Sequence, residues 1–391
     1  MTNKILSESI LQKRINRFKS IKRGYYSLII LISLYVLSIC APIIFNSKAI
    51  MVKYNDDYYF PLFNSIFSNK NIEAKDLGQF EIKGKKKYGQ PHYRLLKKQY
   101  QKEDKGNWVI MPLYPYDPYE EVISEKDEQF TDGNGNGVWD PSEDFIDENG
   151  NGIADKYKYT NFPNSQHLLG TDNQGRDVLS RLIYGFNISI TFAIVCCFLS
   201  YIIGIIIGGT LGYFGGKVDL FGLRIIEIYG SIPFLFMLMI LATFIKPNVY
   251  ILASMYVFLT GWIGITWYVR GEFLREKSKD YVSAAVSMGQ SHWNVMFRHI
   301  LPNSLTPVIT FAPFAIIGYI SALVSLDYLG FGLQPPTPSW GELMAQGRTN
   351  LQYWHLIVSP LFSIGATLFL ITFIGEAIRE AFDPKVHSRL R

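Results

Sequence analysis

Six stretches of this chain are apolar over most of their length and are long enough to cross a lipid bilayer. About 20 predominantly apolar residues are needed to span the hydrocarbon core as a helix. The stretches are residues 26–45, 187–211, 228–245, 250–268, 305–326 and 355–374. The third stretch is the shortest, and the short polar turn that follows it predicts a tight helical hairpin with the fourth. The pattern therefore predicts an all-α membrane protein with six transmembrane helices.

The distribution of positive charge predicts how these helices are oriented. Four polar segments together carry eighteen Lys and Arg residues, whereas the two short segments that alternate with them carry two. The four are residues 1–25, 212–227, 269–304 and 375–391, and the two are residues 246–248 and 327–354. Segments rich in Lys and Arg stay on the cytoplasmic side. We therefore expect both termini to be cytoplasmic and residues 46–186 to be extracytoplasmic.

The extracytoplasmic segment is too long for a simple connection and predicts a small domain over residues 46–166. Alternating apolar and polar positions at 51–54, 58–60 and 108–111 predict short strands. The Pro-rich residues 112–118 predict an extended crossing. We therefore expect an insert of mixed short strands and loops.

Charge within the insert is strongly polarised. Residues 83–105 contain nine basic residues against two acidic ones, and residues 117–155 contain thirteen acidic residues against Lys126 alone. Two interpretations stay open from the sequence. The two charged segments pair with each other, or the basic segment faces lipid head groups.

The acidic segment contains two copies of a calcium-loop pattern. The first has Asp, Asn and Gly at the positions of a twelve-residue loop and ends in Glu143, whereas the second has Lys158 in place of that bidentate Glu. Calcium requires six or more oxygen ligands, which such a loop supplies. The pattern predicts structural Ca²⁺ held by Asp132, Asn134, Asn136, Asp140, Glu143, Asp147, Asn149, Asn151 and Asp155. The alternative is an Asn-Gly-rich surface turn without metal.

Composition narrows the class further. Hydrophobic residues make up 48% of the 391 residues, and the formal net charge of +5 gives no indication of nucleic-acid binding. The three cysteines, Cys40, Cys196 and Cys197, all lie in apolar stretches, so no disulfide framework is expected. The chain contains no Gly-x4-Gly-Lys-Ser/Thr phosphate loop. We therefore expect no ATP hydrolysis by this chain and no enzymatic activity of its own.

Between the fourth and fifth apolar stretches, residues 280–302 predict a soluble hairpin of two short helices. Gly289 is placed to end the first helix in a left-handed conformation, and Ser291 to cap the second. The positions of Trp293, Met296, Phe297 and Ile300 predict one apolar stripe on the second helix, which Leu301-Pro302 would close. A soluble hairpin between membrane spans indicates a docking element. The alternative is a generic amphipathic hairpin on the membrane surface.

This hairpin resembles the cytoplasmic coupling loop of ABC importer permeases. That loop has the pattern Glu-Ala-Ala, three residues, Gly, nine residues, Ile, one residue, Leu-Pro. The chain has Ala284, Ala285, Gly289, Leu301 and Pro302 at that spacing, and departs from it with Ser283 for Glu and His299 for Ile. If the resemblance holds, the five matching residues form the ATPase-coupling surface.

Four further stretches extend the resemblance. Residues 166–185 are similar to the segment that precedes the core spans in C-type permeases of dipeptide and oligopeptide importers, and residues 321–340 and 375–384 also resemble that family. Residues 51–61 resemble a subgroup with a long outside loop that serves importers of oligopeptides and of peptide antibiotics such as microcin C.

The resemblance implies a type I ABC importer permease fold in the inner membrane. The chain would be the permease subunit for oligopeptides or peptide-like compounds and would hold no cofactor for transport. Its partners would be a second homologous permease, two ABC ATPase subunits that bind ATP and Mg²⁺, a solute-binding protein and the lipid bilayer, with no nucleic acid. The implied domains are a cytoplasmic N-terminal segment at 1–25, the first transmembrane helix at 26–45 and the extracytoplasmic insert at 46–166. The permease transmembrane domain follows at 167–385, with the coupling loop at 278–302, and a cytoplasmic tail at 386–391 ends the chain. Competing interpretations are a membrane-anchored calcium-binding sensor or adhesive protein, and a stand-alone channel.

Three other features carry predictions. Gly204, Gly208, Gly212 and Gly216 recur every four residues, which predicts close helix packing, either within the chain or against a partner permease. Gly170 and Gly175 predict tight turns around Asp172, before an amphipathic interfacial helix at 176–184, and neither Asp172 nor His167 has a neighbouring base or nucleophile for catalysis. Asp327, near the membrane edge, is either functional or simply solvated.

Overall fold

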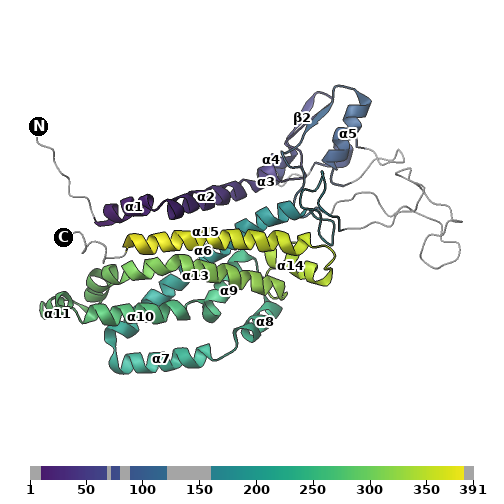
Figure 1. Cartoon of the computed structure of the whole chain (residues 1–391). Helices are drawn as coiled ribbons and strands as arrows, with labels where there is room; N and C mark the ends of the chain where they lie inside the picture. Colours follow the sequence, from purple (N-terminus) through teal and green to yellow (C-terminus); the bar gives the residue numbers. More distant parts are fainter. Residues whose placement is uncertain (1–9, 68–71, 80–88, 121–159, 383–391) are drawn as a thin grey trace, which may run out of the picture. The chain divides into compact units, whose positions relative to one another are not determined.

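The computed structural model describes residues 10–67, 72–79, 89–120 and 160–382 (Figure 1). These residues belong to two compact units. The first comprises Met1–Val36, Phe186–Glu342 and Leu361–Arg391, and the second comprises Leu37–Gly185 and Leu343–Pro360. The two calcium-loop copies predicted from the sequence lie outside the described residues.

Helices carry most of the described chain. They are α1 (Ile10–Ser20), α2 (Lys22–Ile39), α3 (Ala41–Ile44), α4 (Pro61–Phe67), α5 (Tyr93–Glu103), α6 (Val178–Phe214), α7 (Gly216–Gly230), α8 (Phe234–Phe244), α9 (Val249–Tyr256), α10 (Ile263–Lys277), α11 (Asp280–Ser287), α12 (His292–Asn294), α13 (Leu301–Tyr328), α14 (Trp340–Thr349) and α15 (His355–Phe382). A 3-10 turn, η1 (Ala74–Leu77), precedes α5, and two π-helical segments, η2 (Val257–Gly261) and η3 (Val295–Ile300), precede α10 and α13.

Within the described residues, four helices are long and apolar enough to cross a membrane, and the number is six if each of two bent pairs forms one span. Helices α7 and α8 are bent by 69°, and the α9–η2 segment is bent by 53° against α10. The six predicted stretches correspond to these elements. The mostly helical fold and its membrane spans are therefore as predicted, with differences at the ends and bends.

The first difference concerns the third predicted span, which is not one straight helix. Its residues are divided between the end of α7 and all of α8, with the break just before Pro233. Proline lacks an N–H group and disfavours a helical conformation in the residue before it. The apolar run alone could not reveal this bend.

The second difference concerns residues 176–184, which do not form a separate interfacial helix. Helix α6 begins at Val178 and continues to Phe214. Its start is stabilised by Asp177, whose Oδ1 accepts the backbone N–H of Ser180 at 2.8 Å. The predicted amphipathic segment is thus the first part of a continuous 37-residue helix.

Glycines in α6 allow the close approach of α10. A Cβ atom at Gly204 would lie 2.3 Å from the Ile265 side chain, and one at Gly208 would lie 2.4 Å from the backbone oxygen of Thr266. At Gly212 the nearest atom, the backbone oxygen of Arg270, would be 2.6 Å away. These three glycines therefore pack within the chain. Gly216 is not on the same helix, because α6 ends before it and it begins α7.

The second unit contains a small antiparallel sheet in the order β2-β1-β3. Its strands are β1 (Met51–Tyr54), β2 (Asp57–Tyr59) and β3 (Trp108–Ile110), as the alternating positions predict. Val52 pairs with Tyr59 on one side and with Val109 on the other. The β1–β2 turn has positive φ at Asn55 and Asp56, residue types that tolerate this conformation.

The core of this unit forms between the sheet and helix α5. Tyr93, Leu96 and Tyr100 on α5 are buried with Val52 and Val109 of the sheet. Helix α5 lies in the basic segment and was not predicted, since its apolar positions are sparse among Lys, Arg and Gln residues. Helix α14 was likewise not predicted.

Candidate functional site

The hairpin at residues 280–302 has both of the caps that its sequence predicts. Helix α11 ends in a left-handed Gly289 with φ of +73°. The N–H groups of Gly289 and Gln290 donate to the carbonyl oxygens of Val286 and Ala285, at 2.9 and 3.3 Å, which is the paired hydrogen bonding of a Schellman motif. The Ser291 hydroxyl then accepts the N–H of Asn294 at 3.4 Å, capping the next helix. The left-handed conformation of Gly289 and the cap from Ser291 thus explain the turn between the two helices.

The second segment of the hairpin does not end at Leu301-Pro302, contrary to the prediction. It continues through η3 into α13, so that His292–Tyr328 is one helical run. A proline ring clashes with the preceding turn of a regular α-helix. The wider π-helical turn just before Pro302 gives room for the ring, and π-helical turns are frequent at functional sites.

The predicted apolar stripe is divided between a buried and an exposed face. Met296 and Ile300 are buried, together with Val282, Ala285 and Val295 of the hairpin, against Val269 and Phe273 of α10. In contrast, Trp293 is 66% exposed and Phe297 is 42% exposed, and their rings stack on each other with centroids 5.5 Å apart. The hairpin is therefore anchored by one face and presents aromatic rings on the other.

Val286 and Met288 are also exposed and flank the same turn. We refer to Val286, Met288, Trp293 and Phe297 as the exposed apolar face. Beside it lies a groove of about 480 Å³, and it is lined by Tyr213, Phe214, Lys277, Val282, Ser283, Val286, Ser287 and His292. Ser283, at the position where the family pattern has Glu, thus faces a groove.

The five motif residues have different environments. Ala285 is buried in the hairpin core, whereas Ala284, Gly289 and Pro302 are exposed and Leu301 is half-buried. A Cβ atom at Gly289 would meet nothing within 4 Å, so the positive φ, and not a lack of space, requires glycine there.

The segment before α6 contains two fully buried carboxylates, Asp172 and Asp177, and the sequence does not predict their burial. Asp172 Oδ2 lies 2.7 Å from Nη2 and 2.8 Å from Nε of Arg176, and 3.5 Å from Nε of the buried Arg181. Asp172 Oδ1 accepts the N–H groups of Gln174 and Arg176, both at 2.9 Å. The predicted turns are present, with positive φ at Gly170 and Gly175.

Asp177 organises the same region. Its Oδ2 accepts the Tyr114 hydroxyl at 2.8 Å and lies 2.8 Å from Nδ1 of His167. Since Asp172 and Asp177 are both bound by several donors, they fix the connection that leads into α6. The arrangement is that of a structural ionic cluster.

Asp327 at the end of α13 is not simply solvated. Its side chain is buried, with Oδ1 accepting the N–H of Leu333 at 2.7 Å and Oδ2 in contact with the Ser339 hydroxyl. A backbone atom of this loop also approaches closely, because a Cβ at Gly332 would overlap Asp327. Asp327 therefore holds the loop that follows α13.

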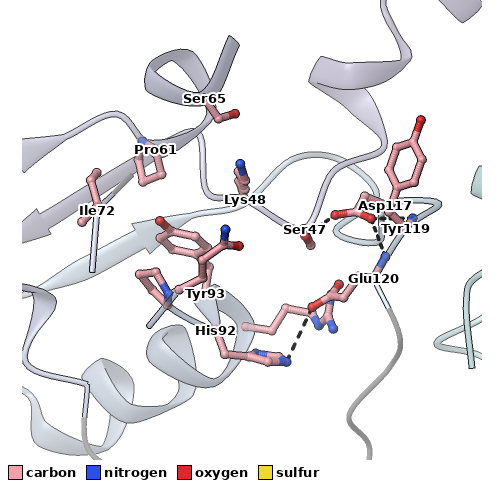
Figure 2. Close-up of a pocket in the computed structure, with 13 residues that line it drawn as sticks. Ser47, Lys48, Pro61, Ser65, Ile72, His92, Tyr93, Asp117, Tyr119 and Glu120 are labelled. Carbon is pink, nitrogen blue, oxygen red and sulfur yellow. Dashed lines mark hydrogen bonds and ion pairs between the residues drawn. The ribbon is translucent and has the colours of Figure 1, made fainter. Parts of the chain in front are cut away.

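The second unit has a pocket of about 350 Å³ at the N-terminal end of α5 (Figure 2). Arg94 from the basic segment pairs there with Glu120 from the acidic segment at 2.8 Å, so the two charged segments pair at this point. Burial raises the pKa of Glu120 in spite of the nearby Arg94 guanidinium. Lys48 and Asp117 also line the pocket, which gives it charges of both signs.

The described residues contain no cluster of three or more His, Cys, Asp or Glu side chains that could hold a metal ion. The nine predicted calcium ligands lie outside the described residues, and the calcium prediction stays a prediction.

The described residues thus include helices long and apolar enough to cross a membrane, with a capped hairpin between two of them. The model of the family described as binding-protein-dependent transport system inner membrane component matches residues 200–388. The chain is 36% identical over 373 residues to the inner membrane ABC transporter permease protein YejE of Escherichia coli strain K12, covering 95% of this chain and 96% of the relative. The chain belongs to this family of ABC importer permeases.

Other relatives extend the comparison. The peptidoglycan transport system permease protein YejE of Agrobacterium fabrum is 35% identical, over 96% of this chain and 93% of its own. The oligopeptide transport system permease protein OppC of Haemophilus influenzae is 37% identical, over 56% of this chain and 70% of its own. A chain of the MetNI methionine ABC transporter covers 52% of this chain and 97% of its own, with 18% identity and a TM-score of 0.42, a likeness too low to add to the assignment.

Proposed function

We propose that this chain is the permease subunit of an ATP-driven importer for oligopeptides or peptide-like compounds. The observation that carries the proposal is the exposed apolar face of the hairpin, which has the form of a docking site. Contiguous apolar patches on a protein surface mark sites of interaction, and Trp is frequent among residues that dominate binding energy.

The partner at this face is a cytoplasmic ABC ATPase, one of two in the assembled importer. Each ATPase supplies the ATP and Mg²⁺ site that this sequence lacks. Closure of the ATPases on ATP would move the hairpin, and the helices joined to it would change between outward-facing and inward-facing arrangements. Packed helices can change between two arrangements by moving as rigid bodies.

The hairpin matches the coupling motif at Ala284, Ala285, Gly289, Leu301 and Pro302, and these residues have two kinds of role in the proposal. Ala284 and Gly289 lie at the exposed surface that a partner would meet. Ala285 is buried and Leu301 half-buried, so they maintain the shape of the hairpin.

The names of the relatives, which include oligopeptide, dipeptide and peptidoglycan transport permeases, support a peptide or peptide-like substrate. Two of the relatives match this chain over 95% and 96% of its length, so the matched region includes the insert. A second homologous permease and an extracytoplasmic solute-binding protein complete the proposed assembly.

The proposed orientation rests on positive charge, with eighteen Lys and Arg residues in the segments assigned to the cytoplasm and two in the alternating ones. It makes both termini and the hairpin cytoplasmic, and residues 46–186 extracytoplasmic. In this orientation the insert faces the solute-binding protein, and calcium held by residues 132–155 would stabilise the insert.

Uptake of a labelled oligopeptide by vesicles that contain the complete complex tests this function. We expect uptake to require ATP inside the ATPase compartment and the solute-binding protein on the other side. Uptake that continues without ATP would favour the stand-alone channel. Full uptake by a variant lacking residues 117–160 would show that the insert is an accessory, whereas calcium-dependent adhesion without any peptide uptake would favour the sensor or adhesive protein.

A further inference from the structure

A buried carboxylate lies where α10 meets the hairpin. Glu276, in the last turn of α10, is only 2% exposed. Its Oε1 lies 2.7 Å from Nζ of Lys279, and its Oε2 accepts the Tyr281 hydroxyl at 2.8 Å. A buried charge is costly unless it is paired and hydrogen-bonded. The folded hairpin therefore depends on these donors being in place.

The hydrogen bonding continues from Tyr281 to α13. The Asn303 side-chain amide donates to the Tyr281 hydroxyl at 3.1 Å and to the carbonyl oxygen of His299 at 3.0 Å. A tyrosine hydroxyl can donate one hydrogen bond while accepting another. Tyr281 in α11 is thus the link between Glu276 of α10 and Asn303 of α13.

The same chain of contacts reaches the turn at Gly289. The His299 ring lies with Nε2 2.8 Å from the Gln290 side-chain oxygen, so the ring nitrogen donates and the amide oxygen accepts. His299 is one of the two positions where the hairpin departs from the family pattern, which has Ile there. The polar residue in this chain thus connects the turn to η3.

We propose that Tyr281 is a positioning residue that transmits movement of the hairpin to α10 and α13 together. This inference rests on the proposed coupling function. The hydroxyl–carboxylate bond is charge-assisted and is stronger than a neutral hydrogen bond. A displacement imposed on α11 is therefore passed through Glu276 to α10 and through Asn303 to α13, and the two spans move as one body.

The second segment of the hairpin also contacts α6, and this contact is not part of the proposed role of Tyr281. Nδ1 of His292 in the hairpin lies 2.8 Å from the Tyr213 hydroxyl, and Nζ of Lys277, at the end of α10, donates to the Tyr213 carbonyl oxygen at 2.5 Å. Because these contacts do not include Tyr281, its removal leaves the hairpin attached to the membrane unit.

The experiment compares Tyr281→Phe with the wild-type chain in the complete complex reconstituted in vesicles. The measured quantity is the number of ATP molecules hydrolysed per peptide imported. Loss of one charge-assisted hydrogen bond shifts the balance between arrangements on the order of tenfold, and we expect a rise of that order in the ratio. The matched control is Tyr250→Phe, since Tyr250 is 59% exposed and its hydroxyl makes no hydrogen bond within the described residues; its ratio should stay at the wild-type value.

Two further variants complete the test. Glu276→Gln retains an oxygen that accepts the Tyr281 hydroxyl, so its ratio should rise less than that of Tyr281→Phe. Asn303→Ala breaks the chain at an exposed position and gives the answer if Tyr281→Phe does not assemble. A wild-type ratio in both Tyr281→Phe and Asn303→Ala overturns the proposal. If the ATPase subunits do not bind even the wild-type hairpin, the proposed coupling function is wrong. This outcome is seen in the wild type and so differs from failure of the Tyr281 proposal, which is seen only in the variants.

Discussion

Replacing Gly208 by Ala tests whether α6 and α10 depend on glycine for their contact. A Cβ atom at this position would lie 2.4 Å from the backbone oxygen of Thr266, and the next nearest atoms are also backbone or near-backbone atoms of α10, at 3.1 Å. Ordinary van der Waals contact begins at 3.4 Å. The two helices would therefore have to separate locally by about 1 Å, the difference between these distances.

The sign of the effect follows from two opposing contributions. Alanine favours a helix interior over glycine by about 0.5–1 kcal/mol. Overpacking of a close contact costs about 1–3 kcal/mol. Because the obstructing atom is backbone and cannot rotate away, we expect the second contribution to prevail and the free energy of unfolding to fall by about 1–2 kcal/mol.

Gly264 provides the matched control within α10. A Cβ atom there would meet nothing within 4 Å, so Gly264→Ala gains the helix preference without the overlap. The assay is thermal unfolding of the purified full chain in lipid nanodiscs. If Gly208→Ala and Gly264→Ala both unfold at or above the wild-type temperature, the contact between α6 and α10 does not depend on glycine at position 208.

Three further predictions concern the second unit. Asp172→Asn removes the buried carboxylate that Arg176 and Arg181 contact and should destabilise the unit by about 3–5 kcal/mol, seen as faster amide hydrogen exchange at residues 170–178; unchanged exchange would contradict it. Because burial raises the pKa of Glu120 above the ordinary 4.5, the folded unit binds this proton more tightly than the unfolded chain, so its stability falls as pH rises from 4.5 through the raised pKa. Exchange at α5 measured against pH should show this dependence in the wild type and lose it in Glu120→Gln. Calorimetric titration of the full chain should show calcium uptake. Asp132→Ala should abolish this uptake, and Asp147→Ala should reduce it by a smaller amount. No uptake by the wild type at millimolar calcium would exclude the site.

The sequence was informative wherever a local pattern determines the local structure. Apolar runs indicated the spans, Gly289 and Ser291 indicated the hairpin turn, and alternation at Val52 and Val109 indicated two strands. Each of these depends on neighbours in the chain, so the residue types alone carry the information.

Features that depend on tertiary contacts could not be predicted. The continuation of the helix past Pro302 depends on a π-helical turn that no residue type specifies, whereas the bend before Pro233 has a local signal in the proline itself, which the apolar pattern does not include. The division of the stripe, with Met296 buried and Trp293 exposed, reflects which face meets α10. The partners of Glu276, Lys279 and Tyr281, lie close to it along the chain, but the burial of its carboxylate depends on tertiary packing that the residue types do not show.

The docking claim is tested most directly by measuring how tightly the ATPase subunits bind the permease complex that carries Trp293→Ala. The control is Trp354→Ala, at a tryptophan that is 54% exposed but outside the hairpin. If the exposed apolar face is the docking site, truncating its central aromatic ring costs about 2 kcal/mol or more of binding free energy. We expect Trp293→Ala to lose ATPase binding and ATP-dependent peptide uptake together and Trp354→Ala to retain both. Wild-type binding and uptake in Trp293→Ala would contradict it.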